Sequence, residues 1–355
     1  MHEDFQRLMQ DATRLTRAGN LDAATAAIRS ALKLRADSVD PAIIDVDARV
    51  VPDADGAAGG DPSPSVRIDD PQAARDADAS FIEGRFGAGT AERSFKLFIP
   101  PDAGSRPMPL VVMLHGCTQD PDDFASGTGM NEAARRTGFF VLYPAQSRKA
   151  NPQRCWNWFK HSHQARGRGE PAILAGMTQD VIGRHAIDST RVYVAGLSAG
   201  GAMAAVLGHT YPEIFAAVGV HSGLPAGAAR DLPSALKAMK DGARSGGSAA
   251  APAVPTIVIH GEADTTVHPS NAEHLFASSG SAEAEWQAES GSVPGGRSWT
   301  RRIRLDANGK RIAEHWLVHG APHAWSGGSS TGSFTDPHGP DATAAMLDFF
   351  RVHAR

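Results

Sequence analysis

A serine flanked by glycines is the feature of this sequence that most directly suggests chemistry. Residues 196–200 have the sequence GLSAG, a G-x-S-x-G pattern centred on Ser198, and the apolar run Val192–Ala195 precedes it. A stretch of small residues with helical character follows. A serine on a sharp strand-to-helix turn needs glycines on both sides, because other side chains would clash there. The pattern predicts Ser198 as a nucleophile, with a purely structural turn as the alternative.

Two later positions supply the partners that a serine nucleophile needs. Its hydroxyl requires a base, and the base requires a carboxylate to orient it. In chains with this kind of serine turn the order is nucleophile, acid, base. Asp264 follows the apolar run Thr256–Ile259, and His323 follows the run His315–Val318. Both lie just past the carboxyl end of an expected strand, where parallel sheets collect functional residues, so we predict them as acid and base.

Each of these partners has a competing interpretation. Asp264 could cap a turn, with Glu262 and the more distant Asp336 as alternative acids. Fifteen histidines make a chance placement of His323 easy, and its position after the nucleophile and the acid favours catalysis. Other histidines near strand ends are expected to be pocket or structural residues: His221, His260, His268 and His319.

A fourth part of the site is the sequence LHGCTQ at residues 114–119, which ends the apolar run Leu110–Leu114. Attack on a carbonyl needs two backbone N–H donors for the developing oxyanion, one after the nucleophile and one after an earlier strand. We assign these donors to the backbones of Cys117 and Ala199; a tight turn that merely requires Gly116 is the alternative. No cofactor or metal is predicted, since neither metal-ligand spacing nor a phosphate loop is recognisable.

The elements that must position these residues alternate along the chain from Phe81 onward. Apolar runs that alternate with helical stretches are typical of a mostly parallel sheet with helices on both faces, so the predicted fold class is α/β. A hairpin around Asn308-Gly309 is expected to extend one side of the sheet. The expected strands are Phe95–Ile99, Leu110–Leu114, Phe139–Tyr143, Val192–Ala195, Ala217–Val220, Thr256–Ile259, Trp299–Leu305 and Arg311–Leu317 with His315–Val318, and the expected helices lie near Met130–Arg136, Ala172–His185, Ala202–Thr210, Asn271–Ala277 and Ala342–Val352.

Composition divides the chain into three zones. Residues 1–36 have apolar positions at helical spacing on either side of a Gly-Asn break, which predicts a helical hairpin. One helical pair cannot bury its own face, so this hairpin should dock on the main domain, fray or meet a partner. Residues 37–80 are rich in Asp, Ala, Pro and Gly and are expected to be a flexible linker. The α/β domain then occupies residues 81–355.

The overall balance of residue types excludes some partners. With 41% hydrophobic and 21% charged residues, the chain has the composition of a soluble globular protein. A net charge of −4 gives no nucleic-acid footprint, and no apolar stretch approaches the length of a membrane span. The first residues lack the pattern of a secretory signal, so the sequence by itself predicts a cytoplasmic protein whose two cysteines are reduced.

The α/β domain resembles the esterases related to poly(3-hydroxybutyrate) depolymerases, a group that includes acetylxylan and feruloyl esterases. The matching stretches are LHGCTQDPDDFA (114–125), CWNWF (155–159), AGLSAGGAM (195–203), VGVHSGL (218–224), HGEADTTVHP (260–269) and HAWSGG (323–328). Together they span most of residues 81–355 and neither of the first two zones. The resemblance implies an α/β-hydrolase fold with Ser198, Asp264 and His323 as nucleophile, acid and base.

The resemblance also implies features that the residues alone do not give. It places Cys117 in the oxyanion hole and pairs it with Cys155 in a disulfide, which allows an extracellular or periplasmic location as well as a cytoplasmic one. This bridge would tie the oxyanion loop to the loop of Trp156 and Trp158. We expect Trp156 and Trp325 to bind substrate beside the site, and Trp158 to belong to the core.

The predicted function is ester hydrolysis through an acyl-enzyme, on poly(3-hydroxybutyrate) or related hydroxyalkanoate oligomers. The alternative substrate is a feruloyl or acetyl ester on a polysaccharide, because members with these substrates share the triad. A second alternative is a non-catalytic hydrolase-fold binding protein that uses the N-terminal helices as its contact surface. The same helices, on their flexible tether, could attach the enzyme to a granule or a protein partner.

Overall fold

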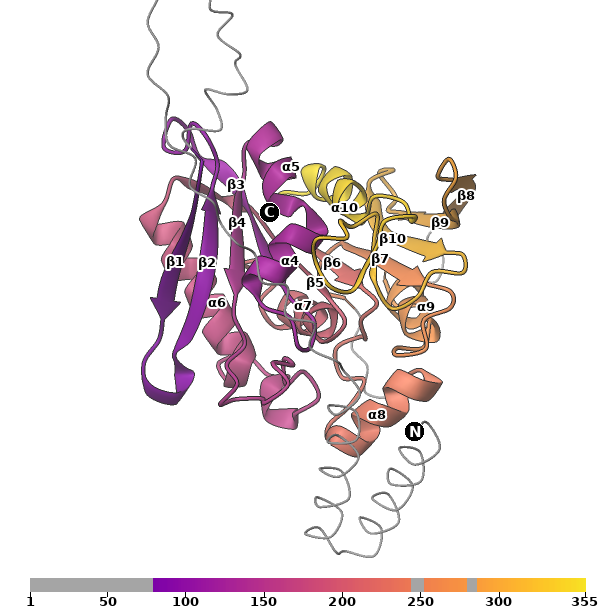
Figure 1. Cartoon of the computed structure of the whole chain (residues 1–355), viewed down its shortest axis with the longest axis horizontal. Helices are drawn as coiled ribbons and strands as arrows, with labels where there is room; N and C mark the ends of the chain where they lie inside the picture. The colour runs from indigo at the N-terminus through magenta and orange to yellow at the C-terminus, as the bar shows by residue number, and fades with distance from the viewer. Residues whose placement is uncertain (1–78, 244–251, 280–285) are drawn as a thin grey trace, which may run out of the picture. The chain divides into compact units, whose positions relative to one another are not determined.

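The computed structural model describes residues 79–243, 252–279 and 286–355. Within these residues the chain forms one ten-stranded sheet in the order β1-β2-β4-β3-β5-β6-β7-β10-β9-β8 (Figure 1). Its strands are β1 (Ser80–Phe86), β2 (Arg93–Ile99), β3 (Met108–Leu114), β4 (Phe140–Pro144), β5 (Ile187–Leu197), β6 (Ala217–His221), β7 (Thr256–Gly261), β8 (Trp286–Ser292), β9 (Ser298–Leu305) and β10 (Arg311–Val318). A separate pair, β11 (Trp325–Ser326) and β12 (Thr335–Asp336), joins two parts of a later loop.

The centre of the sheet is parallel and its two sides are antiparallel. Strands β4, β3, β5, β6, β7 and β10 pair in parallel, so all their carboxyl ends lie at one edge. The pairs β1–β2, β2–β4, β10–β9 and β9–β8 are antiparallel. The shared edge is where β5, β7 and β10 deliver the predicted nucleophile, acid and base.

Helices cover both faces of this sheet because its central strands are apolar on both sides. Leu110, Val112 and Leu114 of β3 pack in one core cluster, and Val111 and Met113 pack in the other, as alternation along a strand requires. The first cluster includes side chains from α6 (Gly169–Arg184), α7 (Ala199–Thr210), α8 (Leu232–Asp241) and α9 (Ser270–Ala277). The second includes side chains from α4 (Pro121–Thr128), α5 (Met130–Thr137) and α10 (Ala342–Arg351). Short 3₁₀ turns, η1 (Gly89–Ala91) and η2 (His161–His163), complete the described elements.

The predicted α/β class and its parallel centre are confirmed, and each strand and helix expected from Phe81 onward corresponds to an observed one. The expected hairpin is β9–β10, and it extends the sheet beyond β7. Strands β1, β8, β11 and β12 and helices α4 and α8 were not predicted from the sequence. The side strand β8 is almost wholly exposed, so it lacks the apolar alternation that marks a strand. Pro121 and Pro233 lie in the first turns of α4 and α8, where proline is a signal of a helix start that the prediction did not use.

The expected N-terminal hairpin lies outside the described residues, and so does the expected linker except for its last two residues. Of those two, Ser80 already begins β1, so the sheet starts one residue before the predicted domain boundary. No helix in the described ranges is both long and apolar enough to span a bilayer.

Candidate active site

The backbone at Ser198 forms a strained turn between β5 and α7. Its φ of 58° and ψ of −118° place a non-glycine residue in a sparsely populated region, which signals a functional constraint. The flanking glycines permit close packing: a Cβ on Gly200 would lie 2.0 Å from the carbonyl oxygen of Leu114, and one on Gly196 would lie 2.5 Å from the carbonyl carbon of Gly200. The turn therefore needs glycine at both positions, as the sequence pattern predicted.

Asp264 and His323 meet across two neighbouring loops. Asp264 follows β7 and His323 follows β10, and these parallel strands are adjacent. The backbone N–H of Ala263 donates to the carbonyl of Ala321 at 3.0 Å and holds the loops together. His323 Nδ1 lies 2.7 Å from Asp264 Oδ2. The arrangement is that of an imidazole oriented by a carboxylate.

The Asp264 carboxylate has partners on both oxygens. Oδ1 accepts the backbone N–H groups of Thr266 and Val267, each at 2.8 Å. Oδ2 lies 3.3 Å from His260 Nε2 in addition to its contact with His323. Burial raises the pKa of this carboxyl, but the hydrogen bonds from His260, His323 and the Val267 backbone outweigh that effect, so its pKa lies well below the usual range. Asp264 is therefore ionised at neutral pH.

His221 connects the nucleophile turn to the loop that carries the base. It ends β6, between the strands of the other site residues, and its carbonyl accepts the N–H of Ser198 at 2.9 Å. Its Nε2 accepts the N–H of Ser326 at 3.0 Å, so the ring proton must reside on Nδ1, which lies 3.2 Å from Ser222 Oγ. Burial lowers the pKa of His221 to about 3, which keeps the ring neutral. His221 is thus one of the structural histidines at a strand end.

The structure brings the three predicted residues to one edge of the sheet, on loops after β5, β7 and β10. Ser198 is 8% exposed, so only a small part of it reaches the surface. Among the described residues, no hydrogen bond joins Ser198 Oγ to His323. Such contacts in resting enzymes often tighten only with substrate, so the arrangement is compatible with proton transfer between them.

The competing acids occupy other places. Glu262 Oε2 accepts the N–H of Gly320 at 3.1 Å, and its side chain is 53% exposed. Asp336 is paired with Arg297. Within the described ranges neither carboxylate contacts His323, which leaves Asp264 as the candidate acid.

The predicted oxyanion loop, residues 114–119, lies directly against the predicted nucleophile Ser198. A Cβ on Gly116 would lie 3.7 Å from Ser198 Cβ, and the Gly116 N–H donates to Gln119 Oε1 at 2.9 Å. The next amide, of Cys117, has no acceptor among the described residues. The same is true of Ala199, whose N–H belongs to the first turn of α7, where helix amides face outward. Both amides assigned to the oxyanion are therefore unpaired within the described structure.

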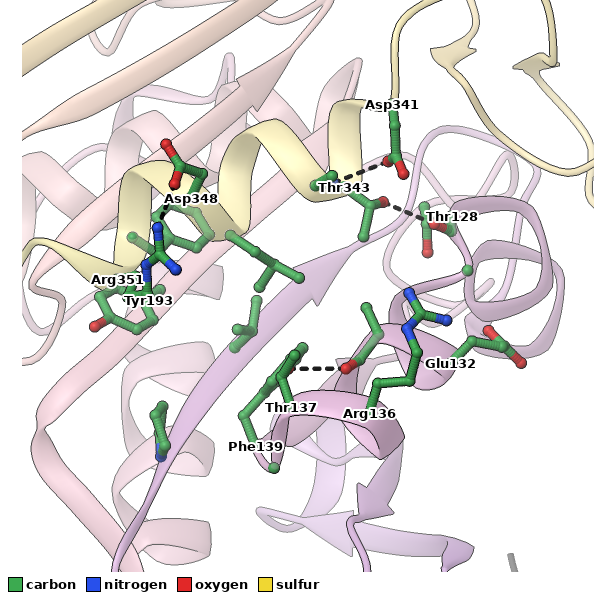
Figure 2. Close-up of a pocket in the computed structure, with 18 of the residues that line it drawn as sticks. Thr128, Glu132, Arg136, Thr137, Phe139, Tyr193, Asp341, Thr343, Asp348 and Arg351 are labelled. Atoms are coloured by element: carbon green, nitrogen blue, oxygen red, sulfur yellow. Dashed lines mark hydrogen bonds and ion pairs between the residues drawn. The ribbon is translucent and has the colours of Figure 1, made fainter. Parts of the chain in front are cut away.

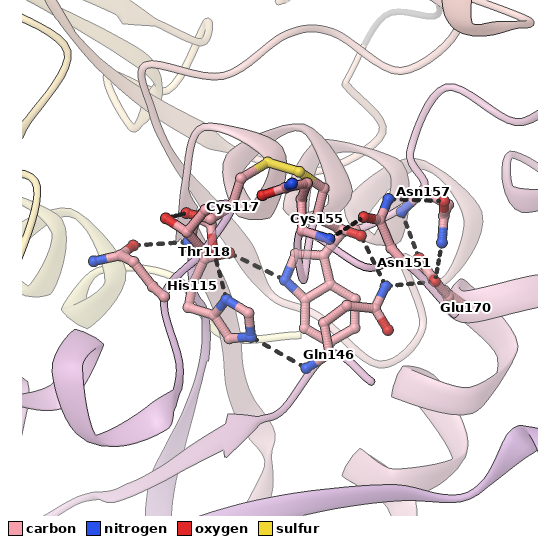
Figure 3. The surroundings of a disulfide bond; sticks show 12 residues. His115, Cys117, Thr118, Gln146, Asn151, Cys155, Asn157 and Glu170 are labelled. Atoms are coloured by element: carbon pink, nitrogen blue, oxygen red, sulfur yellow. Dashed lines mark hydrogen bonds between the residues drawn. A yellow bond between two sulfur atoms is a disulfide. The ribbon is translucent and has the colours of Figure 1, made fainter. Parts of the chain in front are cut away.

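A disulfide joins Cys117 to Cys155, as the resemblance implied (Figure 3). It ties the oxyanion loop to the segment of Trp156, whose indole Nε1 donates to the carbonyl of His115 at 3.1 Å. The bridge therefore sits at the candidate site itself.

The two tryptophans expected to bind substrate are placed differently from that expectation. Trp156 is 0% exposed and Trp325 is 1% exposed. Trp156 lies beneath the oxyanion loop, and Trp325 stacks on His221 with ring centroids 5.0 Å apart. Both side chains are buried against the loops of the site and present no surface to a ligand, which corrects the expectation that they bind substrate. Trp158 is buried in the core, as expected.

Several residues that support the site carry no recognisable signal in the sequence. Gln119 Nε2 donates to Asp123 Oδ2 at 2.9 Å and to the Ser333 carbonyl at 3.0 Å, which ties the oxyanion loop to the loop beyond His323. Gln146 and Glu170 support the other side of that loop. No local pattern marks these residues, because their partners are distant in sequence.

A hollow of about 740 Å³ opens elsewhere, on the face covered by α5 and α10 (Figure 2). Arg136, Tyr193 and Arg351 contribute to its lining, and Thr343 Oγ1 donates to the Thr128 carbonyl at its border. None of the three candidate site residues lines this hollow, so its size alone does not make it the active site.

A nucleophile turn after a central parallel strand, with an acid and a histidine after later strands, defines the class of α/β-hydrolases. An acetyl xylan esterase from Aspergillus awamori superposes with a TM-score of 0.60 at 20% identity, over 76% of this chain and 99% of that one. This likeness supports the fold and confirms the predicted α/β-hydrolase architecture.

The chain belongs to the family described as Esterase PHB depolymerase, whose sequence model matches residues 93–282. It is 32% identical over 237 residues to poly(3-hydroxyalkanoate) depolymerase C of Paucimonas lemoignei, covering 63% of this chain and 57% of that protein. It is 28% identical over 204 residues to a probable acetylxylan esterase A of Aspergillus fumigatus, covering 52% of this chain and 54% of that protein. The chain therefore spans little more than half the length of these relatives.

Proposed function

We propose that this protein is a serine carboxylic-ester hydrolase with Ser198 as nucleophile, Asp264 as acid and His323 as base. The observation that carries the proposal is the 2.7 Å contact between His323 and the ionised Asp264, at the sheet edge that also holds the strained turn of Ser198. Membership of an esterase family supports the same chemistry.

The mechanism is a two-step acyl transfer. His323 takes the proton of Ser198 as its oxygen attacks the ester carbonyl, and Asp264 stabilises the imidazolium that forms. The amides of Cys117 and Ala199 donate to the oxyanion. His323 then protonates the leaving alcohol, and water repeats the attack on the acyl-enzyme.

The proposed substrate is poly(3-hydroxybutyrate) or a related hydroxyalkanoate oligomer. Two relatives support it, the depolymerase of Paucimonas lemoignei and a poly(3-hydroxybutyrate) depolymerase of Ralstonia pickettii that is 31% identical over 241 residues. The alternative is an acyl ester on a polysaccharide, since acetylxylan and feruloyl esterases are relatives of similar identity. A non-catalytic binding protein is the remaining alternative, and the oriented Asp264–His323 pair argues against it.

The test is release of 3-hydroxybutyrate from an amorphous poly(3-hydroxybutyrate) suspension, with the Ser198→Ala protein as the blank. Release above the blank supports both the nucleophile and the polyester substrate. Cleavage of a small activated ester without such release would move the substrate to polysaccharide acyl esters or oligomers. A folded sample that neither cleaves esters nor is labelled at Ser198 by an active-site phosphonate would favour the binding role.

The N-terminal segment is proposed as the attachment to a granule or a protein partner. Its amphipathic sequence pattern, followed by a linker-like stretch, motivates this proposal. Because β1 begins at Ser80, deletion of residues 1–78 leaves the sheet complete. Unchanged sedimentation of the truncated protein with granules would contradict the proposal.

A further inference from the structure

A buried carboxylate lies behind the oxyanion loop and has no part in the mechanism above. Glu170, the second residue of α6, is 2% exposed. Its Oε1 accepts from Gln146 Nε2 and from Asn157 Nδ2, each at 2.6 Å, and its Oε2 accepts the Asn157 backbone N–H at 2.7 Å (Figure 3). Burial raises the pKa of this carboxyl, but the nearby His163 ring and the hydrogen bonds from Gln146 and Asn157 bring it below its usual value, so Glu170 is ionised. An ionised, buried acceptor of this kind fixes its donors firmly, because leaving any of them unpaired is costly.

The donors that Glu170 holds lie in or contact the segment that supports the oxyanion loop. Asn157 follows Cys155 and Trp156 directly, and Gln146 Nε2 also donates to the Cys155 carbonyl at 3.0 Å. From this segment the indole of Trp156 donates to the His115 carbonyl. The carboxylate therefore anchors the far end of both links to the oxyanion loop, the indole hydrogen bond and the disulfide.

A third link reaches the loop through the His115 ring. The Gln146 backbone N–H donates to His115 Nε2 at 3.1 Å, which leaves the ring proton on Nδ1. Nδ1 then donates to the Gly116 carbonyl oxygen at 2.7 Å. Burial lowers the pKa of His115 to about 4, so the ring is neutral and keeps this single tautomer.

The carbonyl that His115 holds belongs to the same peptide unit as the Cys117 amide. In a planar trans peptide the C=O and the N–H point in opposite directions. Fixing the Gly116 oxygen on one side therefore aims the Cys117 N–H at the other side, and this is the amide proposed for the oxyanion.

We propose that Glu170 is a positioning residue that, through Gln146, Asn157 and Trp156, holds His115 and so aims the Cys117 amide at the oxyanion. This inference rests on the proposed esterase function. It means that Glu170, a residue of α6 outside any recognised motif, affects the transition state of the reaction.

The test is Glu170→Gln, which keeps the shape of the side chain but places an amide where donors now meet a carboxylate. With a p-nitrophenyl ester, kcat is expected to fall about tenfold to a hundredfold, less than the loss from removing an oxyanion donor altogether. KM should change by less than about threefold, because the Cys117 backbone N–H acts on the transition state rather than on bound substrate. The inhibition constant of an arylboronic acid, which forms a tetrahedral adduct with the serine, should rise by the same factor as kcat falls.

Glu314→Gln is the matched control. Glu314 is a carboxylate that is 1% exposed, with Arg301 and Arg311 as partners in the β9–β10 hairpin. Its substitution should lower the melting temperature and leave kcat and the boronate affinity unchanged. The inference is overturned if Glu170→Gln keeps wild-type kcat, or if it changes melting temperature without changing boronate affinity.

A milder variant covers the case in which Glu170→Gln does not fold. Trp156→Phe keeps an aromatic ring in the core and removes the N–H that donates to His115 together with the five-membered ring that carries it, so a several-fold loss of kcat at unchanged KM is expected. Full kcat in Trp156→Phe would then overturn the inference. Wild-type protein that cleaves no ester refutes the proposed function itself, whereas active wild type with unaffected variants refutes only the role of Glu170.

Discussion

Replacing Asp264 by asparagine tests the site, because an asparagine cannot accept all the hydrogen bonds that the Asp264 carboxylate accepts. Oδ1 accepts two backbone N–H groups at 2.8 Å, so an asparagine must place its oxygen there. Its Nδ2 then faces His323 Nδ1 and His260 Nε2, where the carboxylate had accepted. His260 keeps its proton on Nε2, because that atom donates to the Val267 carbonyl at 2.8 Å. His323 must therefore offer an unprotonated Nδ1 and carry its proton on Nε2.

This change of tautomer removes the base while preserving the fold. An imidazole with its proton on Nε2 cannot accept the proton of Ser198, and the same substitution in a Ser-His-Asp triad costs roughly 10⁴-fold in kcat. That factor corresponds to about 5.4 kcal/mol of transition-state stabilisation. We expect a 10⁴-fold lower kcat for Asp264→Asn on a p-nitrophenyl ester, with folded protein verified by circular dichroism.

Glu262→Gln provides the control for this experiment. Its carboxylate is half-exposed and accepts from the Gly320 backbone, and its loss should change kcat by less than about threefold. If Asp264→Asn retained more than a tenth of wild-type activity, the assignment of the acid would be wrong. If Glu262→Gln showed the larger loss, the acid would be Glu262.

Two further predictions concern stability. The disulfide separates its cysteines by 38 residues, so reduction or Cys155→Ser should lower the free energy of unfolding by about 4 kcal/mol, measured by urea denaturation; an unchanged midpoint after verified reduction would contradict this. Burial lowers the pKa of His221 to about 3 and that of His115 to about 4, so the unfolded chain takes up these protons first. The contribution of these two histidines to the free energy of unfolding should be fully present above about pH 6.5 and should fall at lower pH by roughly 1.4 kcal/mol per pH unit for each histidine. Equal urea midpoints at pH 7 and pH 5 would refute the argument.

Much of the arrangement could be predicted because its signals are local or follow from topology. The turn at Ser198 has its strand, glycines and helix within one stretch of sequence. Asp264 and His323 could be chosen because the carboxyl ends of parallel strands share one edge, whatever the distance in sequence. Their mutual contact, across 59 residues, needed the structure.

The supporting residues could not be predicted from the same signals. Glu170 lies in the first turn of a helix, where a carboxylate is ordinary, and only packing shows that it is buried beneath a distant loop. His221 was one of several histidines at strand ends, and its bond to Ser326 spans 105 residues. Trp156 and Trp325 look alike in sequence whether they line a pocket or fill a core. Their burial is decided by contacts such as that of Trp325 with Phe124, at 5.5 Å between ring centroids.

The ring of chain closed by Cys117 and Cys155 has a consequence for the order in which the site is built. It encloses α4, α5 and β4, and β4 pairs with β3, the strand that directly precedes the ring. Because a chain is synthesised from its N-terminus, both cysteines are made before β5 brings Ser198. The acid on the loop after β7 follows, and His323 arrives only near the end of the chain. A chain cut short before His323 would lack both the base and the Ser333 carbonyl that accepts from Gln119, so its oxyanion loop would also lose one of the contacts that hold it.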